Sequence, residues 1–477
     1  MKVEVRESHL LAATADLVVV GLHSGESVPA AIAKAPGADA ATGGFKRLSP
    51  IFPADGPRVL VVGLGERDEA NAEKLRVAAA VAVKEATRLE AESLAWLPPD
   101  SVDADLATEA IVTGTILGSY RFDRFRHGDA DEPQTRVEAL TLLAPASVAD
   151  AAEAARIGAE AQNRARDLQS TPANFATPAF LAARAEEIDA EHTTVTVDIV
   201  GREEIAAMGM GGLLAVSQGS VEEPRLIVLR YAGGGSGPTL GLVGKGVTFD
   251  TGGISLKPGA GMQEMKFDMS GAAAVLEAVA AIAELGLAID LIAVVPSTEN
   301  MPSGSAVKPG DVITQYNGVT VEVNNTDAEG RLILADALAY AIELGAEQVV
   351  DIATLTGAVV IALGSTYAAV LGNDDALAEQ LLEAGAVTGE LTWRLPLHPE
   401  FKEMMKGTVA DLSNLASKRE AGTATAASFL EEFVGETPWA HLDIAGTAWD
   451  VGREYTGKDA SGYGVRLLVE LARRSTG

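Results

Sequence analysis

The residues of this chain that could carry chemistry gather in one stretch, residues 245–331. It opens with Lys245, which stands between two glycines, and Asp250, which is followed closely by two more. A lysine at the end of a buried strand is unfavourable unless it is neutral, paired or coordinated. Lys245 is therefore either a neutral amine ligand, whose proton a nearby cation displaces, or a lysine in a salt bridge. This segment alone leaves both interpretations open.

Two further charged residues follow, and each has an ordinary structural explanation when it is taken singly. Lys257 stands just before a Pro-Gly pair and could be a solvated loop lysine. Asp268 precedes an Ala-rich helix predicted over residues 272–285 and could cap the N-terminus of that helix. Neither residue predicts a site without the rest of the pattern.

The decisive segment is the octapeptide 325–332, Asn-Thr-Asp-Ala-Glu-Gly-Arg-Leu. If it is extended, Asp327, Glu329 and Arg331 project to the same side, because side chains alternate along a strand. Two adjacent carboxylates repel each other unless a cation or a shared proton compensates them. With the two earlier aspartates and Lys245 they form an oxygen-rich donor set with one nitrogen. Such a set suits a pair of divalent ions, Zn²⁺, Mn²⁺, Co²⁺ or Mg²⁺, bridged by carboxylates.

Other kinds of catalytic centre find no support in the sequence. There is no cysteine, which excludes thiol nucleophiles, disulfides and Cys-ligated metals. The 6 histidines never stand four residues apart, so no zinc helix of the H-E-x-x-H kind is present, and no G-x-S-x-G elbow occurs. His441 lies in an apolar run and is interpreted as a core histidine rather than a ligand. The chemistry is therefore expected to depend on carboxylates, lysines and arginines.

This pattern resembles the leucyl aminopeptidase family, also called the cytosol aminopeptidases. The octapeptide matches the family signature without a departure, and the likeness covers the second half of the chain, including segments 351–357 and 439–446. It is weaker over the first 160 residues or so. Two small departures touch no ligand: Thr251 stands where serine is common, and 459–462 reads Asp-Ala-Ser-Gly where Gly-Ala-Thr-Gly is usual.

The resemblance implies two divalent metal ions per subunit, Mn²⁺ or Zn²⁺, with Co²⁺ or Mg²⁺ as alternatives. The residues implied for the tighter site are Lys245, Asp250, Asp268 and Glu329. Those implied for the looser, exchangeable site are Asp250, Asp327, through its carboxylate and its backbone carbonyl, and Glu329.

The resemblance also implies how the remaining site residues act. Lys257 would lie over the scissile carbonyl, and Arg331 would hold a bicarbonate ion that acts as general base. The enzyme would be a metallo-exopeptidase, hydrolysing Leu and other, mostly apolar, N-terminal residues from peptides with a water activated by both metals. The resemblance further implies a homohexamer whose active sites face an interior cavity. The residues implied for substrate binding are Met265, Thr354, Leu355, Gly357, Ala445 and Ala448, and alanine at the last position would widen the pocket.

Two rival functions are open, one from the same class of enzyme site and one from a different class of protein. A two-metal phosphoesterase would clamp a phosphate with the same ions. A DNA-binding architectural role is known for some relatives, but 67 acidic against 37 basic residues give this chain a net charge of −30. Such a field repels phosphate backbones, so we expect peptides with a free N-terminus as partners, and neither nucleic acid nor membrane.

The pattern of the chain predicts an α/β fold with two domains, a smaller N-terminal one over 1–160 and a larger catalytic di-metal one over 161–477. Helical patterns cover 69–96 and 148–168, and a polar, turn-rich loop is predicted over 127–133. Alternating strands and helices favour a mostly parallel or mixed sheet flanked by helices. The apolar runs that read as buried strands lie at 17–20, 58–63, 226–229, 240–243, 291–295 and 349–352.

The sequence predicts neither a secretory signal nor a membrane span. The first residues mix charges and show no basic region followed by an apolar run, so we expect no secretory signal and a cytoplasmic location. The uncharged run 352–372 imitates a membrane span in length. It is broken by glycines and hydroxyl residues, so we interpret it as a buried strand, a loop and the start of a helix.

Overall fold

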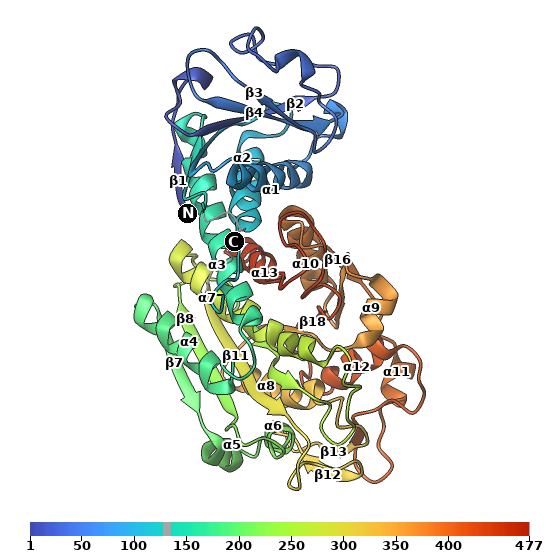
Figure 1. Ribbon diagram of the computed structural model, residues 1–477. Helices are drawn as coiled ribbons and strands as arrows, with labels where there is room; N and C mark the ends of the chain where they lie inside the picture. Colours follow the sequence, from blue (N-terminus) through green and yellow to red (C-terminus); the bar gives the residue numbers. More distant parts are fainter. Residues whose placement is uncertain (127–134, 477) are drawn as a thin grey trace. The chain divides into compact units, whose positions relative to one another are not determined.

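The computed structural model describes residues 1–126 and 135–476 (Figure 1). The chain divides into two compact units, Met1–Asn163 with Gly452–Gly457, and Arg164–Val451 with the residues from Lys458 onward. The segment Gly452–Gly457 thus belongs with the first unit, although the predicted range 161–477 includes it in the second domain. The domain limits 1–160 and 161–477 stay a prediction. The loop predicted over 127–133 lies outside the described residues.

The first unit is built on a six-stranded sheet with the order β1-β6-β5-β2-β4-β3. All neighbouring strands are parallel except β3 and β4. The strands are β1 (Lys2–Val5), β2 (Leu17–His23), β3 (Leu48–Ile51), β4 (Arg58–Gly65), β5 (Ser93–Leu97) and β6 (Ala139–Leu142). The helices are α1 (Ala72–Arg88) and α2 (Ala104–Gly118), with the 3-10 helices η1 (Leu10–Ala12), η2 (Ala38–Ala40), η3 (Arg67–Glu69) and η4 (Ala146–Val148).

The helix predicted over 69–96 is wrong at its C-terminal end. Helix α1 ends at Arg88, and Ser93–Leu97 forms the buried strand β5 instead. The break lies at Glu90, whose φ of 57° is outside the helical region. A short apolar run has the same composition in a buried helix and a buried strand, so periodicity alone did not separate them.

The second unit is built on a nine-stranded mixed sheet with the order β16-β15-β18-β14-β9-β11-β8-β7, with β10 paired to β11. The pairs among β18, β14, β9, β11 and β10 are parallel, whereas β8 and β15 run antiparallel to their inner neighbours. The strands are β7 (Val195–Val200), β8 (Arg225–Ala232), β9 (Leu240–Gly244), β10 (Gly246–Asp250), β11 (Asp290–Asn300), β14 (Gln348–Ala353), β15 (Ala368–Gly372), β16 (Thr392–Arg394) and β18 (Trp439–Asp443).

A small sheet and a set of helices complete this unit. The small sheet contains β12 (Asp311–Thr314), β13 (Thr320–Val323) and β17 (Leu412–Ser413). The helices are α3 (Ala149–Ser170), which begins in the first unit, α4 (Pro178–Glu191), α5 (Arg202–Met208), α6 (Gly211–Ser217), η5 (Met262–Met269), α7 (Ser270–Leu285), α8 (Gly330–Glu343), α9 (Gly357–Leu363), α10 (Asp375–Thr388), α11 (Pro399–Glu403), α12 (Gly422–Glu431) and α13 (Val465–Arg474).

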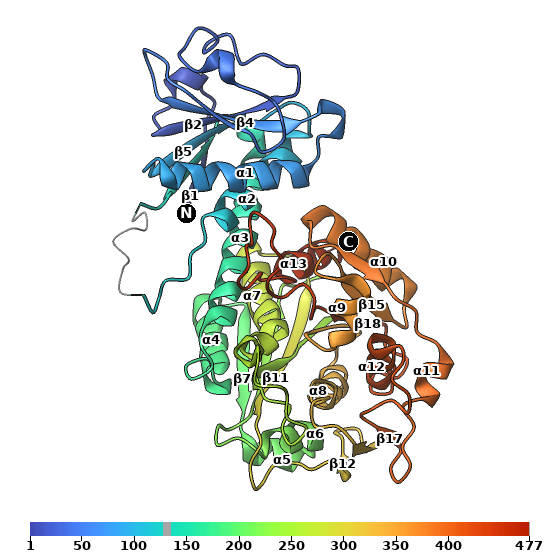
Figure 2. The same ribbon diagram turned by 45° about the vertical axis from the view of Figure 1, so that its right-hand side comes forward.

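The two helices that matter most for the site, α7 and α8, both pack against the central strands β9, β11 and β14. Figure 2 labels both helices and the strand β11. Val349 and Ala353 of β14 share a buried core with Leu332 and Leu338 of α8. Parallel strands covered by helices are buried on both faces, which explains their near-continuous apolar sequences.

Most strand predictions are confirmed. Each of the six apolar runs lies within a strand, in β2, β4, β8, β9, β11 and β14 respectively. The uncharged run 352–372 forms the end of β14, helix α9 and strand β15. Among the residues that the structure describes, no helix combines the length and apolar character that crossing a membrane requires.

Candidate metal centre

The predicted ligands lie where several elements of the second unit begin or end. Lys245 directly follows β9, and Asp250 is the last residue of β10. Asp268 lies near the end of η5, just before α7. Asp327 lies in the turn that precedes α8, and Glu329 is the N-cap residue of that helix. The carboxyl ends of parallel strands are the usual place for a site in a sheet of this kind.

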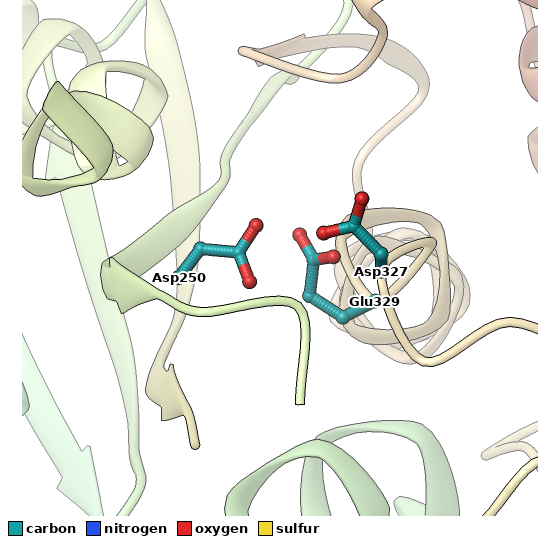
Figure 3. A group of neighbouring side chains, drawn as sticks. All are labelled: Asp250, Asp327 and Glu329. Carbon is teal, nitrogen blue, oxygen red and sulfur yellow. The ribbon is translucent and has the colours of Figure 1, made fainter. Parts of the chain in front are cut away.

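The extended conformation considered for the octapeptide does not occur. Glu329 already has helical dihedral angles, φ −75° and ψ −36°, and Arg331 lies inside α8. A helix start brings the side chains together differently from a strand. Oxygen atoms of Asp250, Asp327 and Glu329 nonetheless lie within 4.8 Å of one another, and Figure 3 shows the three carboxylates pointing toward a common centre.

Lys245 is at the centre of this cluster and is almost completely buried. Its Nζ lies 2.9 Å from Asp268 Oδ1 and 2.8 Å from Glu329 Oε1, and it donates to the carbonyl of Thr354 at 3.0 Å. Burial lowers the pKa of Lys245, but the surrounding carboxylates outweigh burial and the net pKa is raised. The lysine here supplies positive charge to the carboxylates. A divalent cation would supply the same charge and leave the nitrogen free to act as a neutral ligand.

Lys257 approaches the same cluster from the cavity side. Its Nζ lies 2.7 Å from Asp250 Oδ2 and also contacts Asp327 Oδ1. Burial lowers the pKa of Lys257, and the carboxylates of Asp250 and Glu329 more than compensate, so that the net pKa is raised. Because 22% of the side chain is exposed, the ammonium group is within reach of a ligand in the cavity.

Two carboxylates of the cluster, Asp268 and Glu329, are buried close to the charge of Asp250. Burial raises the pKa of Asp268 and of Glu329, and the nearby charge of Asp250 adds to the effect in both. Asp268 Oδ2 and Glu329 Oε2 are buried and accept no hydrogen bond from any described residue. A buried oxygen without a donor is unfavourable by about 1–3 kcal/mol or more when it is charged. The donor set and its two unpartnered oxygens therefore fit divalent cations.

Asp250 is oriented by a residue that the sequence did not reveal. Its Oδ1 accepts hydrogen bonds from Asn300 Nδ2 at 2.7 Å and from the amide of Gly252 at 2.8 Å, which leaves Oδ2 for the centre. Asn300 also donates to the carbonyl of Thr326 at 3.0 Å. The only sequence signal for Asn300 was a polar residue at the end of a long apolar strand.

Two glycines allow the backbone to approach the site closely. Gly252 has a φ of 85°, and a Cβ there would lie 2.8 Å from Asp327 Oδ1. A Cβ at Gly330 would lie 2.9 Å from the Nζ of Lys245. Any other residue at either position would push a charged side chain out of place. Of the two glycines that follow Asp250, Gly252 is thus the one that lets the backbone lie against Asp327.

A cavity of about 420 Å³ opens onto the charged cluster. The predicted ligands and Lys257 line it. Of the residues proposed for substrate binding, those that line it are Met265, Thr354, Leu355, Gly357 and Ala445. Ala448 is fully buried and is not among the lining residues, whereas its neighbour Trp449 is. The ring of Trp449 stacks on Phe267, with centroids 5.4 Å apart and planes 16° apart.

Arg331 is buried beside the cluster rather than on the cavity wall. Only 9% of the residue is exposed, and its Nη1 donates to the carbonyl of Asn414 at 2.9 Å. Its Nε is buried and finds no acceptor among the described residues. Burial lowers the pKa of Arg331 to about 10, although the charges of Glu329 and Asp443 oppose this change. The Nε edge of the Arg331 guanidinium can therefore still donate a hydrogen bond.

Two models of one protein family match this chain. Residues 163–469 match the catalytic domain of the cytosol aminopeptidase family, and residues 13–129 match the N-terminal domain of the same family. The chain belongs to the cytosol aminopeptidase family. The resemblance stated from the octapeptide is confirmed, as is the two-domain α/β architecture. A member of this family is a metal-dependent aminopeptidase, a hydrolase that acts on peptides.

Relatives cover the chain almost from end to end. A probable cytosol aminopeptidase of Roseiflexus castenholzii is 44% identical over 99% of each chain. One from Chlorobium limicola is 51% identical over 76% of this chain and 75% of its own. Among solved structures, the bottromycin maturation enzyme BotP is 37% identical, with a TM-score of 0.89 over 97% of this chain and 100% of its own, and it has also been solved in complex with Mn.

Proposed function

We propose that this cytosol aminopeptidase removes Leu and other, mostly apolar, N-terminal residues from peptides by using two divalent metal ions per subunit. The observation that carries the proposal is the buried cluster in which Asp268 Oδ2 and Glu329 Oε2 have no hydrogen-bond partner, beside a cavity large enough for a peptide end. The proposed ions are Mn²⁺ or Zn²⁺, with Co²⁺ or Mg²⁺ as alternatives. The solved structure of BotP in complex with Mn supports Mn²⁺ among these ions.

We assign the two ions to overlapping sets of ligands. Lys245, Asp250, Asp268 and Glu329 would hold the tighter ion, and Asp250, Asp327 and Glu329 the exchangeable one. Support comes from burial, because Asp327 is 33% exposed whereas Asp250 and Glu329 are each 3% exposed, so its side of the cluster is open to exchange. When bound, such ions lower the pKa of water and polarise a carbonyl group.

Lys257 would stabilise the negative charge that develops on the substrate carbonyl. In the structure its ammonium group pairs with Asp250 and Asp327, the carboxylates that the ions would engage. Engagement of those carboxylates by cations would release the ammonium group toward the cavity. A fixed donor at a developing oxyanion typically contributes about 3–4 kcal/mol to the transition state.

Arg331 would hold a bicarbonate ion that accepts a proton during the reaction. A planar anion fits the forked face of a guanidinium, which lysine cannot copy. The support for this assignment is the buried Nε without an acceptor. The alternative is that Arg331 only balances the charges of Glu329 and Asp443.

The walls of the cavity support a preference for apolar side chains. Met265, Leu355 and Ala445 were proposed from the sequence, and Met262, Val360 and Trp449 also line the cavity. Apolar walls with a few polar groups at one end are typical of sites that bind an apolar side chain and act on the polar group beside it.

We also propose that the protein acts in the cytoplasm and that it forms a homohexamer. The mass of the particle in solution tests the oligomeric state.

The direct test is a panel of aminoacyl amides, assayed after dialysis of the protein against each divalent metal. Leucyl amide should be cleaved, its N-acetyl derivative should not, and an aryl phosphate should be left intact. Cleavage of the aryl phosphate instead would favour the phosphoesterase. A salt-dependent mobility shift with duplex DNA would support the architectural role, against the net charge of −30.

A further inference from the structure

Two segments that resemble the family, residues 351–357 and 439–446, also contain buried carboxylates that have no role in the chemistry described so far. The two segments are neighbours in the sheet, because β14 and β18 pair in parallel with Ala353 beside Asp443. The chain that leaves each strand forms part of the cavity wall. Leu355 comes after β14, and Ala445 comes after β18.

Asp443, the last residue of β18, binds both wall segments and has no exposed surface. Its Oδ2 accepts a hydrogen bond from Thr356 Oγ1 at 2.6 Å. Its Oδ1 accepts from the amides of Leu355 at 3.2 Å, Thr356 at 3.4 Å and Ala445 at 3.3 Å. An ionised carboxylate only accepts hydrogen bonds, and through these four this side chain ties together the two segments that leave the paired strands, in addition to the backbone bond from the amide of Ile444 to the carbonyl of Ala353 at 2.8 Å.

The first of these segments is bonded in turn to the metal centre. Thr354 precedes Leu355, and its carbonyl accepts from Lys245 Nζ at 3.0 Å. Its hydroxyl donates to Asp268 Oδ1 at 2.6 Å. A shift of the segment would therefore move two ligands of the tighter ion at once.

Asp351 provides a contrast on the adjacent strand. It is equally buried, but it binds His441 Nδ1 at 2.6 Å and Trp439 Nε1 at 2.7 Å, both within β18. None of these contacts reaches the cavity wall. The two aspartates thus share burial and sheet position but differ in what they hold.

We propose that Asp443 is a positioning residue of the metal centre, which through residues 354–356 sets the geometry of Lys245 and Asp268. The inference rests on the proposed function, because it takes those two residues as metal ligands. Partners that orient metal ligands typically change metal affinity about 10–100-fold when they are removed. A residue that served only to stabilise the sheet would lower the unfolding temperature and leave the affinity unchanged.

The test compares Asp443→Ala and Thr356→Val with Asp351→Ala in the full-length protein. For each variant, the dissociation constant of Mn²⁺ is measured by equilibrium dialysis, and the thermal midpoint is measured on metal-stripped protein. We expect Asp443→Ala and Thr356→Val to weaken Mn²⁺ binding at least ~10-fold. Asp351→Ala should leave the affinity within about threefold, whatever its cost in thermal stability. The double variant should bind about as weakly as Asp443→Ala alone, because both changes break the same contact.

A second variant keeps the test decisive if Asp443→Ala does not fold. Asp443→Asn keeps an oxygen for the three amides, so it should fold, and it should bind Mn²⁺ more weakly than the parent. Parental affinity in Thr356→Val and Asp443→Asn would overturn the inference, as would an equal loss in Asp351→Ala. A parent protein that neither binds Mn²⁺ nor cleaves aminoacyl amides would instead contradict the proposed function.

Discussion

Lys245 and Glu329 meet at 2.8 Å between Nζ and Oε1, although one follows a buried strand and the other begins a helix. Both side chains are only 3% exposed. Their contact joins the end of β9 to the start of α8. A second contact of Lys245, with Asp268, adds η5 to the same centre. With Asp250 at the end of β10, the buried cluster is assembled from four separate elements of the chain.

The carboxylates of this cluster should not contribute equally to catalytic activity. Glu329→Gln and Asp327→Asn should each lower kcat/KM at least ~100-fold. Glu329→Gln should lose more, because Glu329 is proposed to serve both ions and Asp327 only one. Kinetics and elemental analysis on both variants check this, with Asp189→Asn, at an exposed position of α4, as the control. Glu329→Gln that kept both ions and near-parental turnover would refute the ligand assignment.

Lys257 should act on the substrate rather than on the metals. Lys257→Ala should lower kcat about 10²–10³-fold, because a cation at the developing oxyanion is lost. Its metal content should stay at the parental value, since Lys257 is not a proposed ligand. Steady-state rates with a metal analysis of the same sample decide the point. A variant that turned over normally, or that lost its metals, would show that Lys257 has a different role.

Arg331 should affect the reaction rate through a bicarbonate ion that it binds. Arg331→Ala should lose any stimulation of the rate by added bicarbonate, and Arg331→Lys should be impaired, because an ammonium group does not offer a planar fork. Rates are compared in bicarbonate-depleted and bicarbonate-supplemented buffer with the metal occupancy verified. If the parent enzyme is indifferent to bicarbonate while Arg331→Ala binds metal poorly or unfolds, Arg331 is a structural ion-pair partner.

Trp449 should influence which N-terminal residue is accepted. The ring lines the cavity and is supported from behind by Phe267. Trp449→Ala should lower kcat/KM for leucyl amide relative to alanyl amide about 10-fold, because one apolar wall is lost. The matched control is Trp393→Ala, since Trp393 is 57% exposed and does not line the cavity. An unchanged ratio in Trp449→Ala would exclude this contribution.

Much of the site could be predicted because its residues are chemically unusual. A lysine between glycines and a pair of adjacent carboxylates are hard to explain without a cation, and these residues do gather in one place. The strands were predictable for a similar reason, since a strand covered by helices on both faces must be apolar throughout.

The rest depends on contacts between residues far apart in the chain. Asn300 and Asp443 look like ordinary polar residues at strand ends, and only the fold shows that one orients Asp250 and the other fixes the cavity wall. The family resemblance implied Ala448 for substrate binding, whereas the cavity is lined by its neighbour Trp449. The direction of a side chain in an irregular segment has no periodic signal from which this could have been predicted. The strand β5 was missed where a short apolar run continued a helical pattern.

The central claim is that activity requires two divalent ions in this cluster. The most direct measurement is a titration of metal-stripped protein with Mn²⁺, in which the ions bound per subunit and the rate with leucyl amide are followed together. The account predicts no activity in the stripped protein and full activity only as the second ion binds. Full activity in protein shown by elemental analysis to hold no divalent metal would contradict it.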